Sequence, residues 1–259
     1  MNRVEYFFRV FSKAEPSLRS AQPLQKPTRV YLPGLTDQPW HDPSQFAWVP
    51  QLEENYKIIQ KELLNLRDQN NRFRPNLEPQ DFFPDYHHAY VGSQWNLFYL
   101  FLHGKKFEEN CALCPETVKL LESIPRVTGT IHFSVLTAKT HIAPHCGAFN
   151  WVLRCQLPLI VPPDCQLCIA NETRTLVEGK LMIFDDTFRH HAWNNSDYSR
   201  FVLVFEVYHP DLTDSEIQEF EAIRDRDPLV KKAFQSWLKV IEDAAKEPVA
   251  TDLWNLQKL

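Results

Sequence analysis

The sequence predicts a mainly β protein with flanking helices, arranged around one antiparallel sandwich or barrel. Short β-rich runs follow one another between residues 129 and 208, and turn signals such as PPD, EGK and NNSD separate them. Helical periodicity brackets this region on both sides. A chain of 259 residues, 44% of them hydrophobic, is large enough to bury such a core as a single domain.

The first part of the chain predicts an arm followed by a helix. Residues 1 to 48 are rich in proline and aromatic side chains and show no long hydrophobic period, so we expect them to wrap the core rather than stay solvated. Between Leu52 and Leu66 the apolar residues step by four and three, which is one face of an amphipathic helix. Residues 69 to 88 are polar and broken by proline, which predicts a loop.

The middle of the chain changes from helix to strand. The run from Trp95 to Leu102 fits either element, because its spacing is helical but its composition is aromatic. A short helix is predicted from Pro115 to Ser123, since proline suits the first helical position. The β runs then lie at residues 129–136, 151–161, 165–172, 180–184 and 200–208.

The C-terminal part returns to helix. Thr213 and Glu216 form the pattern of a capping box, and apolar residues at helical spacing follow as far as Ile241. We therefore expect one or two helices that pack on the sheet. The predicted organisation is one domain over residues 1–259, with the arm and first helix in 1–75, the β core in 76–212 and the C-terminal helices in 213–259.

Composition narrows the choice of partners. A net charge of −5 with no basic stripe argues against nucleic-acid binding. The longest apolar run in the middle of the chain, Asn96 to Leu102, is far shorter than the roughly 20 residues of a spanning helix. Arg3, Glu5 and Arg9 interrupt the apolar patch near the N-terminus, which argues against a secretory signal. We expect a cytoplasmic protein whose partner is a small molecule or a peptide, with no nucleic acid and no membrane.

Six cysteines raise the alternative of a zinc site. Cys111 and Cys114 form one CxxC pair, and Cys165 and Cys168 form another. The pairs lie farther apart in sequence than the usual zinc-ribbon spacing, and the second pair sits in an alternating run where its two thiols face opposite sides. Reduced and partly buried thiols are therefore favoured over zinc.

Two histidines and an arginine stand at the ends of predicted strands. His145 follows a turn shortly before the 151–161 run, His190 lies between the last two runs, and Arg200 opens the last one. Imidazole is a good ligand for iron, and the guanidinium fork binds a carboxylate through two hydrogen bonds. This set points to a metal that chelates an anionic cosubstrate.

Ordered sequence blocks around these residues resemble a known family. The blocks are PHCG at 144–147, the strand from Asn150 to Leu157, EGK at 178–180, FDDTFRH at 184–190 and HP at 209–210. Together they resemble the catalytic region of the aspartyl/asparaginyl β-hydroxylases. Fainter similarity extends upstream, so that the resemblance covers roughly residues 31 to 213. The resemblance implies a double-stranded β-helix of the jelly-roll or cupin-like kind, an Fe(II) centre, 2-oxoglutarate and O2 as cosubstrates, and hydroxylation.

The resemblance also implies roles for single positions. His145 and His190 match the two iron ligands of the family. Arg200 and Ser134 match the pair that grips the far carboxylate of 2-oxoglutarate, and Arg154 matches an arginine that binds its near carboxylate.

Some positions depart from the common pattern or compete with it. Gln156 stands where the family has a histidine, which affects the contact with the near carboxylate. Gly147 stands where most facial-triad oxygenases carry an acidic ligand, as the resemblance implies, and this leaves a coordination site for water. Asp186 is the candidate to hold that water. His191 competes with His190 as the ligand, and the FDDTFRH register favours His190.

Alternation along the predicted strands supports this site independently. Arg154 and Gln156 share one strand face, as do His132 and Ser134. Polar side chains inside a barrel need something to bind, because their burial is otherwise costly. His132 and His141 are therefore further candidates for the lining of the pocket.

Three functions are compatible with these residues. The first is a dioxygenase that hydroxylates an Asp/Asn-type or related amino acid, a peptide or a small metabolite. The second is a halogenase of the same mechanistic class, because Gly147 would also admit a halide to the metal. The third is a non-catalytic cupin-like binding module, against which the retained histidines and arginines argue.

Overall fold

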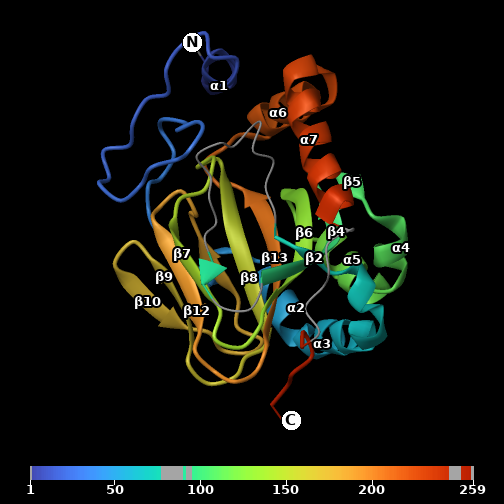
Figure 1. Cartoon of the computed structure of the whole chain (residues 1–259). Helices are drawn as coiled ribbons and strands as arrows, with labels where there is room; N and C mark the ends of the chain where they lie inside the picture. Colours follow the sequence, from blue (N-terminus) through green and yellow to red (C-terminus); the bar gives the residue numbers. More distant parts are fainter. Residues whose placement is uncertain (1, 77–89, 92–94, 245–251, 258–259) are drawn as a thin grey trace.

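A computed structural model of the chain describes residues 2–76, 90–91, 95–244 and 252–257. Within these residues two antiparallel sheets face each other, and helices pack on the outer face of the larger sheet (Figure 1). Apolar side chains fill the space between the sheets, among them Leu136 and Val204 from the larger sheet and Ile142 and Leu167 from the smaller. The prediction of a mainly β fold with flanking helices is confirmed.

The larger sheet has the strand order β1-β11-β8-β13-β6-β4-β2, and β5 also pairs with β4. The bounds of its strands are β1 Trp40–His41, β2 Arg74–Pro75, β4 Trp95–Leu102, β5 Lys105–Lys106, β6 Val127–Leu136, β8 Val152–Ile160, β11 Met182–Phe184 and β13 Arg200–Tyr208.

The smaller sheet has the order β10-β9-β12-β7-β3. Its strands are β3 Tyr90–Val91, β7 His141–His145, β9 Cys165–Ile169, β10 Glu172–Thr175 and β12 His190–Asn194. From β6 to β13 the chain passes between the two sheets repeatedly, with β6, β8, β11 and β13 in the larger and β7, β9, β10 and β12 in the smaller. This is the jelly-roll arrangement of a double-stranded β-helix, as expected.

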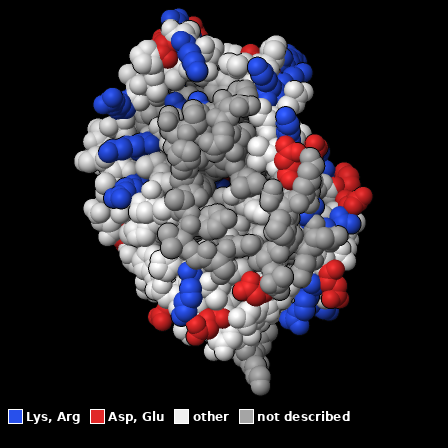
Figure 2. Space-filling model, viewed as in Figure 1, with Lys and Arg blue, Asp and Glu red and all other residues white. Residues whose placement is uncertain are grey.

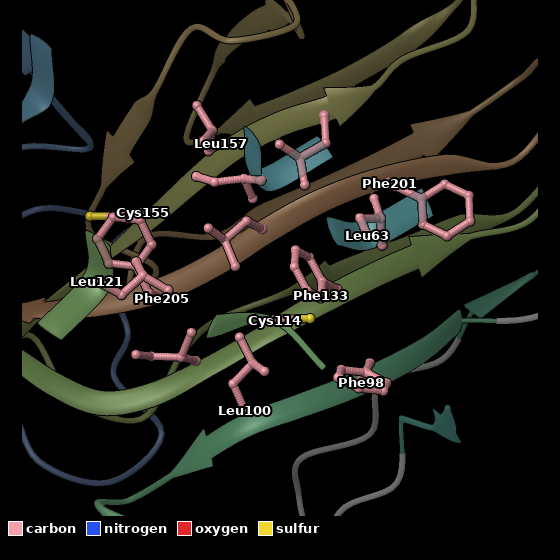
Figure 3. Close-up of a cluster of buried hydrophobic side chains, with 14 of the residues drawn as sticks. Leu63, Phe98, Leu100, Cys114, Leu121, Phe133, Cys155, Leu157, Phe201 and Phe205 are labelled. Atoms are coloured by element: carbon pink, nitrogen blue, oxygen red, sulfur yellow. The ribbon is translucent and has the colours of Figure 1, made fainter. Parts of the chain in front are cut away.

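Helices cover the larger sheet and one end of the molecule. Their bounds are α1 Arg3–Phe11, α2 Val49–Glu54, α3 Tyr56–Asn65, α4 Glu108–Ala112, α5 Pro115–Glu122, α6 Asp214–Arg226 and α7 Pro228–Ala244, with 3-10 turns η1 Pro43–Gln45 and η2 Leu66–Arg72. Leu63 of α3 and Leu121 of α5 are fully buried against sheet residues such as Phe133 and Leu157 (Figure 3). This apolar layer fixes the outer face of the sheet and turns the other face toward the cavity.

The N-terminal arm contains a helix that the sequence analysis did not predict. In α1, Asn2 caps the first turn by accepting a hydrogen bond from the backbone N–H of Glu5 at 2.7 Å. Val4, Phe7 and Val10 form its buried face. The arm was expected but this helix was not, because a nine-residue helix depends mainly on tertiary packing, which local patterns underestimate.

Other elements refine the expectations. The helix predicted across Leu52 to Leu66 is two helices that meet at Asn55, and the ambiguous run at Trp95 is the strand β4. The capping box at Thr213 is confirmed. The loop expected at 69 to 88 is replaced at its start by η2 and β2, and its residues 77 to 88 lie outside the described part of the chain. The strands β7 and β12 were not expected, because both are short and carry histidines at their ends.

The described surface on the face of Figure 2 carries mixed charges. Lysine and arginine side chains lie singly or in small groups around its margin, and acidic side chains lie on the right and lower sides. None of the helices in the described part of the chain combines the length and apolar character that crossing a membrane requires. The expectation of no nucleic-acid partner stays a prediction.

Candidate metal and anion site

The two predicted metal ligands lie opposite each other on neighbouring strands. His145 is the last residue of β7, His190 is the first residue of β12, and the two are partners in the register of the smaller sheet. Their ring centroids are 4.0 Å apart, and both rings line the same cavity. The fold brings them together because β7 and β12 are antiparallel, so the end of one strand meets the start of the other.

Both imidazoles are held in the tautomer that suits a metal. Nδ1 of His145 donates to the carbonyl of Ala143 at 2.8 Å, and Nδ1 of His190 donates to the carbonyl of Phe188 at 2.9 Å. A carbonyl only accepts, so the proton is on Nδ1 and the lone pair is on Nε2. Burial and the neighbouring His190 lower the pKa of His145 to about 3, which keeps its ring neutral at neutral pH.

Asp186 lies beside the histidines in the space that Gly147 leaves open. A Cβ built on Gly147 would lie 2.8 Å from Oδ2 of Asp186 and closer still to its Oδ1 and Cγ. The backbone N–H of Gly147 also donates to the carbonyl of Asp186 at 2.7 Å. A carboxylate thus lies beside position 147, although it belongs to Asp186 and is bonded to Arg154.

Arg154 holds that carboxylate in place. Its Nε and Nη2 donate to Oδ2 of Asp186 at 3.0 and 2.6 Å, and Nη2 also lies 3.0 Å from Oε1 of Glu206. Arg154 therefore sits between two carboxylates on the cavity wall. Its role at the near carboxylate of 2-oxoglutarate stays a prediction.

Glu206 was missed in the sequence. It lies in β13, where burial raises the pKa of its carboxyl and Arg154 lowers it again, and its Oε2 accepts from Oγ1 of Thr128 at 3.2 Å. The available signal was a single acidic residue inside the otherwise apolar run from Phe201 to Tyr208. A buried carboxylate in such a strand needs a cation, and Arg154 supplies it.

Arg200 is a buried cation in need of an anion. It is 2% exposed, and its Nε and Nη1 have no hydrogen-bond partner among the described residues. Burial lowers the pKa of its guanidinium to about 10, so it is still protonated at neutral pH. Burying a charge without a partner costs roughly several kcal/mol. The guanidinium of Arg200 is therefore suited to bind an anionic ligand in the cavity that it lines.

Ser134 lies next to this arginine on the neighbouring strand. In the pairing of β6 with β13, Arg200 is opposite Leu136 and Ser134 is opposite Val202, two positions along. Ser134 is 3% exposed and its Oγ accepts from Nε1 of Trp95 at 2.9 Å. A hydroxyl that accepts one bond can donate another, so Ser134 still has a donor available near Arg200, and the role of this pair at a carboxylate stays a prediction.

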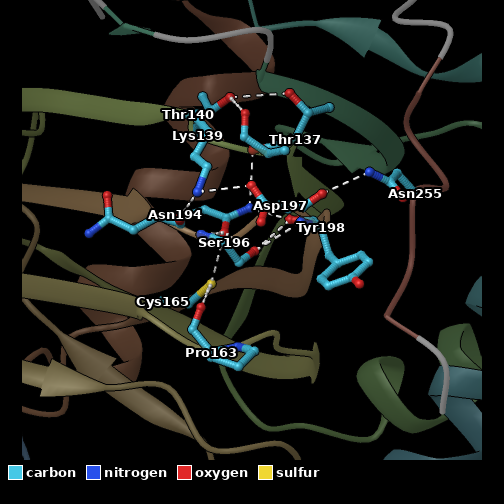
Figure 4. A network of polar contacts seen from close by, with 12 residues as sticks. Thr137, Lys139, Thr140, Pro163, Cys165, Asn194, Ser196, Asp197, Tyr198 and Asn255 are labelled. Atoms are coloured by element: carbon cyan, nitrogen blue, oxygen red, sulfur yellow. Dashed lines mark hydrogen bonds and ion pairs between the residues drawn. The ribbon is translucent and has the colours of Figure 1, made fainter.

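A buried polar network fixes the start of β13 and hence Arg200. Asn194, which is fully buried, accepts from the N–H and Oγ of Ser196 and donates to the carbonyl of Tyr198 at 2.7 Å (Figure 4). Asn255, near the C-terminus, ties the same turn by donating to the carbonyl of Asp197 at 2.7 Å. This network holds the turn that leads directly into Arg200.

Two further polar side chains complete the polar end of the cavity, whose volume is about 330 Å³. Oε1 of Gln156 and Nδ1 of His132 are buried without a hydrogen-bond partner among the described residues. Burial lowers the pKa of His132 to about 3, so this ring is neutral. Both side chains lie level with Val204 in the strand register and are suited to bind a polar ligand in the cavity.

Two other histidines lie away from the cavity. His141 is exposed and bonds to Asn195 through Nε2, so the expectation that it lines the pocket is wrong. The pairing of β7 with β12 shifts register between His190 and Ala192, and such a bulge reverses the alternation that would carry His141 inward. His191 stacks on Trp193 instead of facing the cavity.

The cysteine pairs do not meet. Cys111 and Cys114 lie in the core under the larger sheet, whereas Cys165 lies in β9 and donates to Asn194. In the described part of the chain, no group of three or more His, Cys, Asp and Glu side chains is arranged to hold a metal ion. The pair His145 and His190 is thus the donor set available for a metal in the cavity.

Fold and site together define a jelly-roll protein with a two-histidine metal centre as its candidate site. A family model described as Aspartyl/Asparaginyl beta-hydroxylase matches residues 53–210, more than half of the chain. The chain therefore belongs to the aspartyl/asparaginyl β-hydroxylase family.

Individual relatives agree with this family. The human protein named aspartyl/asparaginyl beta-hydroxylase is 34% identical over 198 residues, which is 73% of this chain and 25% of that protein. A Rhizobium tropici protein named ornithine lipid ester-linked acyl 2-hydroxylase is 35% identical over 179 residues, covering 68% of this chain and 62% of that protein. The match thus spans a quarter of the length of the human relative.

Among solved structures, a 2OG-Fe(II) oxygenase family oxidoreductase from Burkholderia pseudomallei is similar with a TM-score of 0.37 and 10% identity. It covers 47% of this chain and 72% of its own. This likeness is distant.

Proposed function

We propose that the chain is an Fe(II)- and 2-oxoglutarate-dependent dioxygenase that hydroxylates its substrate. The observation that carries the proposal is the buried Arg200, whose Nε and Nη1 lack a partner among the described residues and which lines the same cavity as His145 and His190. A metal pair of histidines and a buried cation in one cavity suit a small dianion that also chelates the metal.

The residues present fit these two groups. His145 and His190 would hold the iron through Nε2, and Asp186 would accept a hydrogen bond from a water ligand beside Gly147. Arg200 and Ser134 would bind the far carboxylate of 2-oxoglutarate. When bound, the iron and 2-oxoglutarate supply the oxidising chemistry, while the protein orients the groups and excludes water from the cavity.

The position of Asp186 counts against the halogenase alternative. Its carboxylate fills the space next to Gly147, on the side where a halide would replace the missing acidic ligand. A carboxylate accepts a hydrogen bond from a water ligand but not from chloride, which has no proton to donate, and this favours water. A binding module would also use Arg200 to hold an anion, so turnover of 2-oxoglutarate is what distinguishes this alternative from the enzyme.

The substrate is one of the classes that the sequence suggested, namely an amino acid, a peptide or a small metabolite. The human relative is named for aspartyl and asparaginyl groups, and the Rhizobium relative for an acyl group. A cytoplasmic location is part of the proposal, and the six free cysteines suit a reducing compartment.

The test is turnover of 2-oxoglutarate. The full chain is loaded anaerobically with Fe(II) and 2-oxoglutarate and then exposed to O2, and succinate is followed by mass spectrometry with a panel of amino acids, peptides and acyl compounds. We expect succinate formation that depends on iron and is abolished in His145→Ala. A chlorinated product in excess chloride would replace the hydroxylase with the halogenase, and binding of iron with no turnover on any compound would favour a binding module.

A further inference from the structure

The cavity extends beyond the metal site into an apolar region. Arg200 lines the cavity at the start of β13, and toward the end of that strand, where Tyr208 pairs with Val152, the lining comes from α1, α6, α7 and the start of β8. We call this apolar region the aromatic arm, and the residues that define it are Phe7, Phe11, Trp151, Phe220, Ile223 and Val230.

The aromatic arm has rigid walls. The ring of Phe7 stacks on Trp151 with centroids 4.4 Å apart, and Phe220 meets the same Trp151 edge-on at 4.0 Å. Phe11 stacks on Phe7 at 5.4 Å. Trp151 and Phe11 remain partly exposed although they belong to this packed cluster, so they present apolar surface to the cavity.

Much of the aromatic arm is built by segments outside the family match. The model of the family ends at residue 210, whereas α6 and α7 follow it and α1 precedes its start at residue 53. In Figure 1 these helices lie together above the open end of the sheets. The metal site therefore belongs to the shared core, and the surface that meets the rest of the substrate belongs in large part to the flanking segments.

The chemistry of the aromatic arm selects its occupant. A peptide carries an N–H and a carbonyl at nearly every residue, and burying them among aromatic rings without partners is costly. An unbranched aliphatic chain has no such groups and gains from every methylene removed from water. We propose that the substrate carries an unbranched aliphatic chain that lies in the aromatic arm, which places carbon atoms of that chain toward the metal. That the bound chain is hydroxylated rests on the proposed function, whereas the binding of the chain does not.

Binding can be tested without the metal. The full metal-free chain is titrated by calorimetry with octanol, decanol and dodecanol, linear alcohols without a charge for Arg200 to attract. Affinity should rise with chain length, by up to about fourfold for each added methylene, with a negative change in heat capacity. Equal affinity for octanol and dodecanol, or tighter binding of a trileucine amide than of dodecanol, would overturn the aliphatic occupant.

Variants of α7 locate the site. Ala233 lines the cavity, so Ala233→Phe should weaken dodecanol binding by about tenfold or more, because its ring takes the space of several methylenes. Val230→Phe is a second variant of the same kind in case the first does not fold. Lys232→Phe is the matched control, since Lys232 is exposed on the same helix, and it should leave binding unchanged. Unchanged binding in both cavity variants would place the chain elsewhere and refute the proposal.

The outcomes separate the two proposals. Length-dependent binding of the alcohols with no turnover of 2-oxoglutarate would refute the proposed function and leave the aromatic arm standing. Turnover of 2-oxoglutarate with no length-dependent binding would refute the aliphatic chain and leave the dioxygenase standing.

Discussion

The carboxylate of Asp186 occupies the space that any side chain at position 147 would need. Position 147 therefore requires glycine because of the contact with Asp186, and not because of its backbone conformation. Arg154 holds Asp186 there with two hydrogen bonds, so the carboxylate cannot swing aside without losing them. The two-histidine site and the glycine thus belong to one arrangement.

The first prediction concerns this contact. Gly147→Ala should lower the thermal midpoint of the metal-free protein, because the new Cβ would overlap a carboxylate that Arg154 restrains. Overpacking of this kind costs roughly 1–3 kcal/mol. In an Asp186→Ala background the same substitution should cost little, since its obstacle is gone. Thermal unfolding of the four proteins of this cycle tests the contact, and equal losses in both backgrounds would show that Asp186 is not the obstacle.

The second prediction concerns the metal. We expect one Fe(II) per chain, lost in His145→Ala and in His190→Ala, because each ring presents Nε2 to the cavity. His191→Ala and His141→Ala are matched controls from the same two strands that should keep the iron, since neither side chain lines the cavity.

Metal content is measured after anaerobic loading and desalting. Iron retained by His190→Ala and lost from His191→Ala would reverse the choice between these neighbours. Zinc bound in the wild type and lost on replacement of Cys111 and Cys114 would show that the cysteines hold a metal after all.

The third prediction concerns Arg200. Because its charge is buried without a partner among the described residues, Arg200→Met should raise the thermal midpoint of the protein without cosubstrate. The same variant should lose the stabilisation that 2-oxoglutarate gives the wild type, and its requirement for 2-oxoglutarate should rise by about 30-fold or more. Arg174→Met, a change at a more exposed strand arginine, should keep the response.

Ser134→Ala should have a smaller effect in the same direction, since it removes one neutral donor. A normal response to 2-oxoglutarate in Arg200→Met would remove this residue from the anion site.

The sequence predicts which side chains line the site better than it predicts the residues that these side chains contact. Period-two alternation places Arg154 and Gln156 on one face of β8, and both line the cavity while Cys155 packs in the opposite core. The FDDTFRH register selects His190 over His191, and the structure turns that ring toward His145. The alternation is local, so one sequence contains it, whereas the choice of His190 follows from the resemblance to the family block.

Contacts between segments that are distant in the sequence could not be predicted from the sequence alone. Asp186 and Gly147 are in contact although they lie far apart in the sequence. Glu206 contacts Arg154 because their strands, β13 and β8, are paired. The helix α1 is stable because its face packs on α6 and on Trp151, which its own sequence does not reveal. Such features follow from tertiary packing, whose energy exceeds local propensity.

Buried neutral histidines make the fold sensitive to acid. Burial lowers the pKa of His41 to about 4, with His209 contributing, and lowers the pKa of His132 and of His145 to about 3. Below pH 6.5, the ordinary pKa of histidine, these side chains bind protons in the unfolded chain but stay neutral in the folded chain. The free energy of unfolding therefore falls as pH falls. Asp185 acts in the opposite direction, because burial raises its pKa to about 7 and the folded state then binds a proton first.

The last prediction follows from this balance, in which three strongly shifted histidines outweigh Asp185. The thermal midpoint of the metal-free protein should fall by roughly 5–10 °C from pH 6.5 to pH 5, by an amount set by the net protons taken up on unfolding. His41→Gln removes one of these groups that does not line the cavity, so the midpoint of this variant should depend less steeply on pH, whatever its value at neutral pH. His141→Gln, a change at an exposed histidine, should keep the wild-type slope. Calorimetric scans across this range test the prediction. A midpoint that rises as pH falls would mean that Asp185 and Glu206 dominate. An unchanged slope in His41→Gln would mean that His41 has the same pKa in the folded and the unfolded protein.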